Sequence, residues 1–203
     1  MVSFRNCFSY FSGKLECYLR NKGIDYTGVE ADARALNKIY HATGVKKVPA
    51  VEMDDGHWLF DTTPIIQWFE HTNPVRSMLP DDPALKFLAL LIEDYADEWL
   101  WRPAMWWRWE PIASRRALGY TIANNIDLPW MPKWFFARFF AWRQRRTWLW
   151  GDGVTKATAH QVRDLYPDEL AFLQSILSDQ PYLLGKRPSV ADFGFFASMF
   201  RHF

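Results

Sequence analysis

The sequence predicts an α/β domain followed by an all-helical domain, and three observations support that prediction. Residues 1–74 alternate between short strand-like and helix-like segments. Residues 84–203 keep a helical spacing of apolar residues throughout. Between them, residues 75–83 are rich in proline and aspartate and are expected to form a linker.

In the first domain, the pattern predicts a βαβ unit followed by a hairpin and a helix. Strands are expected near residues 2–8 and 25–29, and helices over residues 12–22 and about 31–42. An Asp-Asp-Gly turn at residues 54–56 joins two further short strands, which is a hairpin signal. A helix is then expected from Thr63 to His71.

The first helix of the second domain is predicted to be amphipathic. Its apolar residues recur every three or four positions and are expected to face the core: Leu85, Leu88, Ala89, Ile92, Tyr95, Ala96 and Trp99. Its acidic residues are expected to face the other way: Glu93, Asp94, Asp97 and Glu98. Pro103 should kink or end this helix. Later helices are expected over about 132–149, 158–178 and 189–202.

Composition argues against several classes of protein. With a formal net charge of +1, no strong field recruits nucleic acid, and no such partner is expected. Cys7 and Cys17 form no Cys-x-x-Cys pair and no His/Cys cluster has ligand spacing, so no metal is expected. We expect Cys7 to be a buried, inert thiol in the first strand. No signal peptide or run of the ~18 apolar residues that span a bilayer is evident, which favours a cytoplasmic protein.

One segment of the helical domain, residues 130–146, mixes aromatic residues with five basic ones. Such a segment could lie on an anionic membrane surface, and aromatic–basic interleaving is also found in single-strand binding proteins. The near-zero net charge argues against nucleic acid. A core helix whose arginines reach outward to water explains the segment most simply, so membrane contact is not expected.

The most informative stretch begins at Val48-Pro49 and continues through the hairpin to Asp61-Thr62. A proline cannot donate to a sheet ladder, so Pro49 belongs at the first residue of a strand or at an edge. If the Val48–Pro49 bond is cis, the backbone N–H and C=O of Val48 turn outward and can pair with a bound peptide. An acidic residue, a hydroxyl and free helix N-terminal amides lie next to that backbone. Together they could hold a small peptide with an ammonium and a carboxylate.

This arrangement resembles the glutathione-binding domain of the glutathione transferase superfamily, whose signature is Val-Pro, a hairpin, an acidic residue with Ser or Thr, and a helix. Two other segments match the family at the right distances. Ser9 to Lys14 is followed by Lys22-Gly23-Ile24, and Ser189 with Asp192 resembles the capping box of the family's sixth helix. The resemblance, to cytosolic, serine-type, bacterial-like members, covers nearly the whole chain. It implies a thioredoxin-like N-terminal domain and an all-α helical-bundle domain.

The resemblance places Ser9 where a serine or cysteine acts on the glutathione sulfur. The proline that usually follows is Tyr10 here, a departure from the family pattern. A hydroxyl that donates to the sulfur beside a helix N-terminus would favour the thiolate. The alternative is that Ser9 merely caps the helix. Tyr10 and Ser12 are rival donors.

The other glutathione contacts follow from the same resemblance. Asp61 would accept the α-ammonium, Thr62 would bind the γ-glutamyl carboxylate through its hydroxyl and amide, and Val48, before Pro49, would pair with the cysteinyl backbone. Lys47 could reach the glycyl carboxylate, although a solvated surface charge is the simpler interpretation. Asp61-Thr62 could equally be an ordinary helix N-cap.

The family's second-substrate pocket is lined by the kinked first long helix of the helical domain. Trp101, Met105 and Trp106 lie in that stretch, and Tyr10 would face it. An aromatic lining would suit flat, apolar co-substrates. The alternative is that these residues simply form core.

The resemblance therefore implies an enzyme that transfers the glutathione thiolate to an apolar electrophile, with a role in detoxification. Glutathione would be the co-substrate, an apolar small molecule the second substrate, and the protein a homodimer. The alternative is a non-catalytic binding or interaction module of the same fold, with a membrane-peripheral role as a further option. Relatives usually continue through further helices, so either the protein is short or C-terminal helices are missing.

Overall fold

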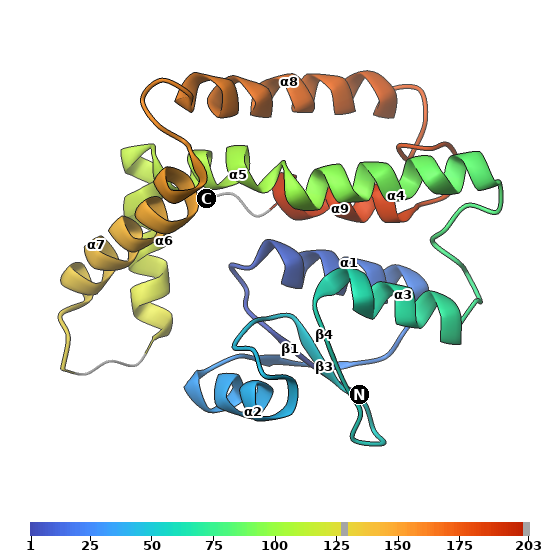
Figure 1. The fold of residues 1–203 in the computed structure, drawn as a ribbon, viewed down its shortest axis with the longest axis horizontal. Helices are drawn as coiled ribbons and strands as arrows, with labels where there is room; N and C mark the ends of the chain where they lie inside the picture. Colours follow the sequence, from blue (N-terminus) through green and yellow to red (C-terminus); the bar gives the residue numbers. More distant parts are fainter. Residues whose placement is uncertain (127–129, 201–203) are drawn as a thin grey trace. The chain divides into compact units, whose positions relative to one another are not determined.

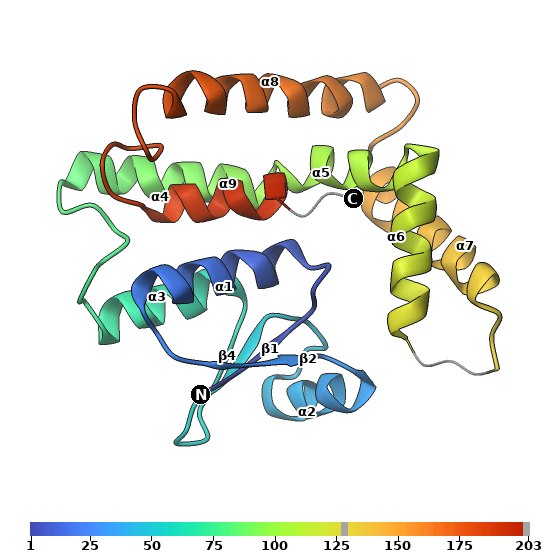
Figure 2. The same ribbon diagram turned by 180° about the vertical axis from the view of Figure 1, so that it is seen from behind.

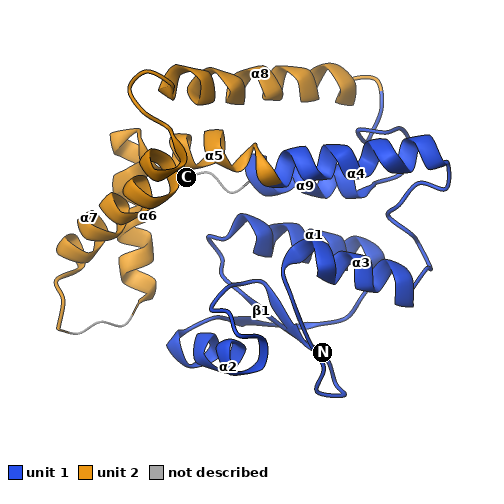
Figure 3. Cartoon of the chain, in the orientation of Figure 1, with its two compact units in different colours: residues 1–97, 180–201 blue, residues 98–179, 202–203 orange. Residues whose placement is uncertain are grey.

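The computed structural model describes residues 1–126 and 130–200, which form two compact units (Figure 3). The described part of the first unit is residues 1–97 with 180–200, and that of the second is residues 98–126 with 130–179. The predicted domain division at residues 75–83 remains a prediction. The first compact unit contains the chain segments that precede and follow the second unit in the sequence.

The first unit contains a four-stranded mixed sheet, which confirms the α/β prediction (Figure 1). Its strands lie in the order β2-β1-β3-β4, and their bounds are β1 Val2–Arg5, β2 Thr27–Glu30, β3 Ala50–Glu52 and β4 Trp58–Phe60. The β1–β2 pair is parallel, and the other two pairs are antiparallel. Helices α1 (Tyr10–Lys22) and α3 (Thr62–Thr72) cover one face, and α2 (Ala33–Thr43) covers the other.

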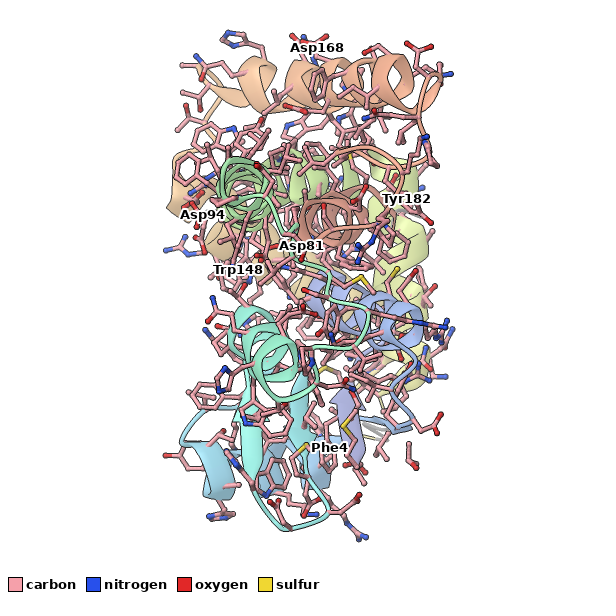
Figure 4. The ribbon with its side chains drawn as sticks, turned by 90° about the vertical axis from the view of Figure 1, so that its right-hand side faces the viewer. Phe4, Asp81, Asp94, Trp148, Asp168 and Tyr182 are labelled. Atoms are coloured by element: carbon pink, nitrogen blue, oxygen red, sulfur yellow. The ribbon has the colours of Figure 1, made fainter. Side chains whose placement is uncertain are left out.

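Alternation along β3 supplies both faces of the sheet. Val51 packs into the core with α1 and α3, whereas Ala50 joins Phe4 and Ile39 on the α2 side. Phe4, labelled in Figure 4, stacks on Trp58 with ring centroids 5.3 Å apart. Successive residues of β3 therefore pack against helices on opposite faces of the sheet.

Two further helices complete the first unit, α4 (Pro83–Glu98) and α9 (Val190–Phe200), which lie side by side in Figures 1 and 2. They approach closely at Gly194, where an added Cβ would meet the Ala96 Cβ at 3.1 Å. The capping box before α9 is confirmed in part. The Ser189 amide donates to Asp192 at 2.8 Å as predicted, but the Ser189 hydroxyl donates to the same carboxylate instead of capping an amide.

The predicted orientation of the helix around α4 is wrong on both faces. Leu85, Leu88 and Trp99, expected in the core, are exposed, whereas Glu93 is 4% exposed and Asp97 is largely buried. The physical reason is a distant partner. Lys14 of α1 reaches both carboxylates, and an ion pair makes burial of these charges less costly. Cys7 is also exposed rather than buried, because β1 ends at Arg5.

The second unit is helical, as predicted, with α5 (Trp101–Trp109), α6 (Ile112–Asn125), α7 (Lys133–Gln144) and α8 (Ala159–Leu177). A π-helical turn, η1 (Arg145–Leu149), and a short 3-10 turn, η2 (Trp150–Asp152), follow α7. The break before α5 agrees with the expected effect of Pro103, which cannot donate to the carbonyl of Trp99.

The interpretation of residues 130–146 as a core helix is wrong for most of its aromatic residues. Trp134 is 56% exposed, Phe139 46% and Trp142 47%, whereas Ala137 and Ala141 are buried. Close packing explains this. A Cβ on Gly119 of α6 would lie 3.2 Å from the Ala137 carbonyl oxygen, so only small side chains fit between the two helices.

Candidate functional site

The sheet register brings three predicted segments to one end of the sheet. Ala50 pairs with Phe4 near the end of β1 and with Phe60 at the end of β4. The chain before β3 therefore lies near the chain that leaves β1 and β4. Those segments contain Val48-Pro49, Ser9 and Asp61-Thr62. The N-termini of α1 and α3 lie at the same end, so their free amides face this region.

The Val48–Pro49 peptide bond is cis, as predicted. Pro49 is buried directly before β3, and Val48 is half-buried. Within residues 1–126 and 130–200, no hydrogen bond is found for the backbone N–H or C=O of Val48. These two groups are the kind of open backbone that can pair with an extended peptide.

Asp61 is the N-cap of α3, so the structural interpretation of this residue is confirmed. Its Oδ1 accepts from the Thr62 amide at 2.7 Å. Its backbone has φ 68° and ψ 140°, a region that glycine adopts more readily than aspartate. Residues held in such conformations are enriched at functional sites. The side chain is exposed, so its carboxylate is also available to a ligand.

Thr62 is 1% exposed, so its side chain is not open to a ligand in the way that an exposed binding residue would be. Its hydroxyl oxygen is enclosed, with no hydrogen-bond partner among the described residues. Its amide is taken by Asp61. A ligand carboxylate that is to bind at Thr62 must therefore displace the Asp61 carboxylate from this amide.

Ser9 caps α1, and its Oγ accepts from the Ser12 amide at 3.2 Å. Because that contact uses a lone pair, the hydroxyl proton stays available to an external acceptor. The rivals are less accessible. Ser12 is 1% exposed and its Oγ accepts from the Asn6 amide at 3.2 Å, and Tyr10 is 6% exposed. The cap reading of Ser9 is therefore correct and compatible with a donor role.

A buried charge cluster lies behind these helix N-termini, and sequence reasoning missed it. Lys14 Nζ donates to Glu93 Oε1 at 2.7 Å and also to Asp97, and Thr63 Oγ1 lies 3.3 Å from Asp97 Oδ2. Burial raises the pKa of both Glu93 and Asp97, and the negative charge of Asp61 adds to the rise at Asp97. The signal in the sequence was the four-residue spacing of two acids on one helix face.

The remaining predicted residues stay predictions. Lys47 is exposed, and no ion pair of its side chain is found among the residues described. Trp101, Met105 and Trp106 are half-buried on α5 of the second unit, whereas Tyr10 belongs to the first. In the described residues, no group of three or more potential metal ligands gathers.

Comparison with known proteins agrees with this architecture. Residues 4–77 match the family model of the glutathione S-transferase N-terminal domain. A glutathione S-transferase from Rhodospirillum rubrum has 16% identity and a TM-score of 0.64, with 98% of this chain and 76% of that chain covered. A glutathione S-transferase from Methylobacillus flagellatus with glutathione bound has 15% identity and a TM-score of 0.60, with 98% and 81% covered.

A maleylacetoacetate isomerase from a Methylobacterium, with bound malonate and glutathione, has 18% identity and a TM-score of 0.56, with 98% and 80% covered. These identities are low, so the solved structures show the fold. Residues 4–77, which carry the cis Val48–Pro49 bond and Asp61, match the model of the glutathione S-transferase N-terminal domain, and the chain as a whole has the fold of glutathione S-transferases of known structure.

Proposed function

We propose that this protein binds glutathione and transfers its thiolate to an apolar electrophile. The observation that carries the proposal is the meeting of three groups at one end of the sheet: Ser9, the exposed carboxylate of Asp61, and the backbone of Val48, which forms no hydrogen bond with the residues that the structure describes. A peptide backbone, an ammonium and a thiol would each find a complementary group there. Structures of the same fold with glutathione bound support this ligand.

In the proposed complex, Val48 pairs with the cysteinyl backbone and Asp61 accepts from the α-ammonium. The γ-glutamyl carboxylate then replaces Asp61 at the Thr62 amide. The exchange is favourable because the carboxylate of Asp61 gains a charged partner when it leaves a neutral one. Lys47 would meet the glycyl carboxylate as a flexible, exposed cation.

Ser9 would stabilise the glutathione thiolate. A free thiol has a pKa of ~8.5, so few molecules are ionised at neutral pH. Lowering that pKa by ~2 units requires about 2.7 kcal/mol. A hydrogen bond to the anion together with the N-terminus of α1 can supply this amount. The thiolate then forms a bond to the electrophilic carbon as the leaving group departs. Thiol–disulfide exchange is not proposed, because serine cannot form the mixed disulfide.

The second substrate would contact the aromatic residues Trp101 and Trp106 together with Met105, all on α5. Such side chains favour flat, apolar molecules, which are the usual targets of detoxifying conjugation. We include the homodimer in the proposal, since α4 exposes apolar side chains that a partner would cover.

Retention on immobilised glutathione and elution by free glutathione, followed by turnover of an activated dinitrophenyl halide, test the proposal. Retention with turnover supports it. Retention without turnover across a panel of electrophiles favours the non-catalytic binding module. A folded protein that is not retained contradicts glutathione binding.

A further inference from the structure

The second unit carries an outer face that the proposed transferase function does not use. We define the α7 outer face as six exposed side chains of α7 and η1: Trp134, Arg138, Phe139, Trp142, Arg143 and Arg146. At 100° per residue these positions fall within one half of the helix. A helix that packs its alanines inward and exposes this much aromatic surface has the reverse of the usual distribution.

The charge of this region is as uneven as its hydrophobicity. Residues 112–149 contain seven basic residues and one acidic residue, a formal charge of +6. The remainder, with 17 basic and 22 acidic residues, carries −5. The small net charge of the chain therefore hides a strongly positive helix pair. Burial lowers the pKa of Arg115. The positive charges of Arg145, Arg116 and Arg138 lower it further, and the negative charge of Glu110 opposes them.

Aromatic and cationic groups are interleaved on this face instead of being segregated. The Phe139 and Trp142 rings lie 6.0 Å apart, and the Arg146 guanidinium lies 5.6 Å from the Trp142 ring. Next to the face, Arg145 lies 4.8 Å from the ring of Trp150 and is ion-paired with Glu110 at 2.8 Å. Such a mixture suits the headgroup layer of a bilayer, where indole rings sit at the depth at which guanidinium groups meet phosphates.

From these observations, we propose that the α7 outer face docks on an anionic membrane surface. None of the described helices has the length and apolarity to cross a bilayer, so the contact is interfacial. The uncovered aromatic rings enter the headgroup boundary, and Arg138, Arg143 and Arg146 bind lipid phosphates.

Two other occupants fit the face less well. A second copy related by a two-fold axis would place like faces together, so two strongly positive surfaces would repel each other. A nucleic acid strand needs open ring faces for base stacking, but the Arg146 guanidinium already lies 5.6 Å from the ring of Trp142. A negatively charged lipid surface provides phosphates for the arginines and an apolar boundary for the exposed rings.

The experiment is flotation of the full chain with vesicles of phosphatidylglycerol and phosphatidylcholine in roughly equal amounts, against phosphatidylcholine alone. Three variants are compared: an aromatic one (Trp134→Ser, Phe139→Ser, Trp142→Ser), an arginine one (Arg138→Gln, Arg143→Gln, Arg146→Gln) and a control on α8 (Leu170→Ser, Phe172→Ser, Leu177→Ser). The α8 residues are 43%, 53% and 45% exposed, so the control removes comparable surface from the same unit. Circular dichroism verifies that each variant is folded.

We expect wild type and the α8 control to float with the anionic vesicles and not with the neutral ones. Each basic side chain contributes about fivefold to partitioning at an anionic surface, so the arginine variant should bind roughly 100-fold more weakly. The aromatic variant should lose binding at both low and high salt, whereas wild-type binding weakens as salt rises.

Several results would overturn the inference. One is a wild type that does not float with anionic vesicles, and another is an α8 control that loses as much binding as the aromatic variant. Light scattering that shows the aromatic variant to be smaller than wild type would make the face a contact between copies. Binding of a single-stranded oligonucleotide without vesicle binding would make it a nucleic-acid surface.

Discussion

At the scale of single residues, the candidate site uses groups that already have structural roles. Asp61 caps α3, and Ser9 caps α1. Asp61 holds its cap at φ 68°, where glycine would be less strained. The cap contributes about 1 kcal/mol, whereas a non-glycine residue in such a region costs about 1–3 kcal/mol. A carboxylate at this position is therefore better explained by ligand binding than by stability alone.

Replacing Asp61 by glycine should separate these two roles. Asp61→Gly should leave the free energy of unfolding unchanged or slightly raised, because relief of strain offsets loss of the cap. It should weaken glutathione binding by about 1.5–3 kcal/mol, since the ammonium loses its charged partner. Calorimetry and denaturant titration measure the two effects.

Asp32 provides the matched control for that substitution. It caps α2 through a contact with the Ala35 amide at 2.8 Å, and its φ is −75°. Asp32→Gly should lose a few tenths of a kcal/mol of stability and bind glutathione normally. If Asp61→Gly binds as well as Asp32→Gly does, Asp61 is a structural cap only.

At the scale of elements, two buried lysine–carboxylate clusters hold α1 in the first unit. Glu70 of α3 accepts from Lys22 at 2.8 Å, from Ser77 at 2.6 Å and from Tyr18 at 2.7 Å. Burial favours the neutral acid, but these hydrogen bonds prevail and lower the pKa of Glu70. The Lys14 cluster differs because two carboxylates share one ammonium, and burial raises the pKa of both Glu93 and Asp97.

The two clusters should respond to pH in opposite directions. The contribution of Glu70 is present above its unfolded pKa of ~4.3 and is lost as pH falls through its lowered folded pKa. The stability that Glu93 and Asp97 contribute is present below their unfolded pKa values and is lost as pH rises through their raised folded pKa values. Glu70→Gln should therefore reduce the fall in the free energy of unfolding on the acid limb of its pH profile. Glu93→Gln should reduce the fall on the opposite limb, where pH rises. Denaturant titrations from about pH 3 to about pH 8 measure both limbs.

Removing Lys14 gives a complementary prediction. Lys14→Met leaves two buried carboxylates without their cation, which should cost about 3–5 kcal/mol of stability at neutral pH. The cost should shrink in acid, where both carboxyls accept protons. A loss of stability that does not depend on pH would mean that the cluster contributes packing rather than charge.

Local signals made much of the first unit predictable. The cis Val48–Pro49 bond before β3, the turn at residues 54–56 and the contact of Asp192 with the Ser189 amide each depend on neighbours in the chain, and each forms. The faces of α4 and α7 were not predictable in this way. Periodicity finds an apolar stripe but does not say what covers it, and the partner of Glu93 lies 79 residues away. The candidate site was found from the family resemblance, whereas the lysine cluster behind it required the structure.

At the scale of the whole molecule, the exposed apolar residues of α4 predict association. Leu85, Phe87, Leu88 and Leu91 are 43%, 68%, 38% and 51% exposed. At 100° per residue these four positions fall within one half of the helix, an arrangement typical of an interface. On a two-fold axis, two such patches would cover each other.

Light scattering of charged variants tests that homodimer. Phe87→Glu with Leu91→Glu should convert a dimer to a monomer, because association would bury uncompensated carboxylates. Phe172→Glu on α8, at a residue that is 53% exposed, should leave the dimer intact. A wild-type mass equal to one chain at micromolar concentration would contradict the dimer.

If glutathione is bound and ionised at the N-terminus of α1, the pKa of its thiol must be lowered there, and a titration measures that pKa. The ultraviolet absorbance of the bound thiolate is followed against pH in wild type, Ser9→Ala and Ser12→Ala. We expect a thiol pKa well below ~8.5 in wild type and Ser12→Ala, and a pKa near that value in Ser9→Ala, which still binds glutathione. A thiol pKa that is the same in wild type and Ser9→Ala would show that Ser9 does not stabilise the thiolate.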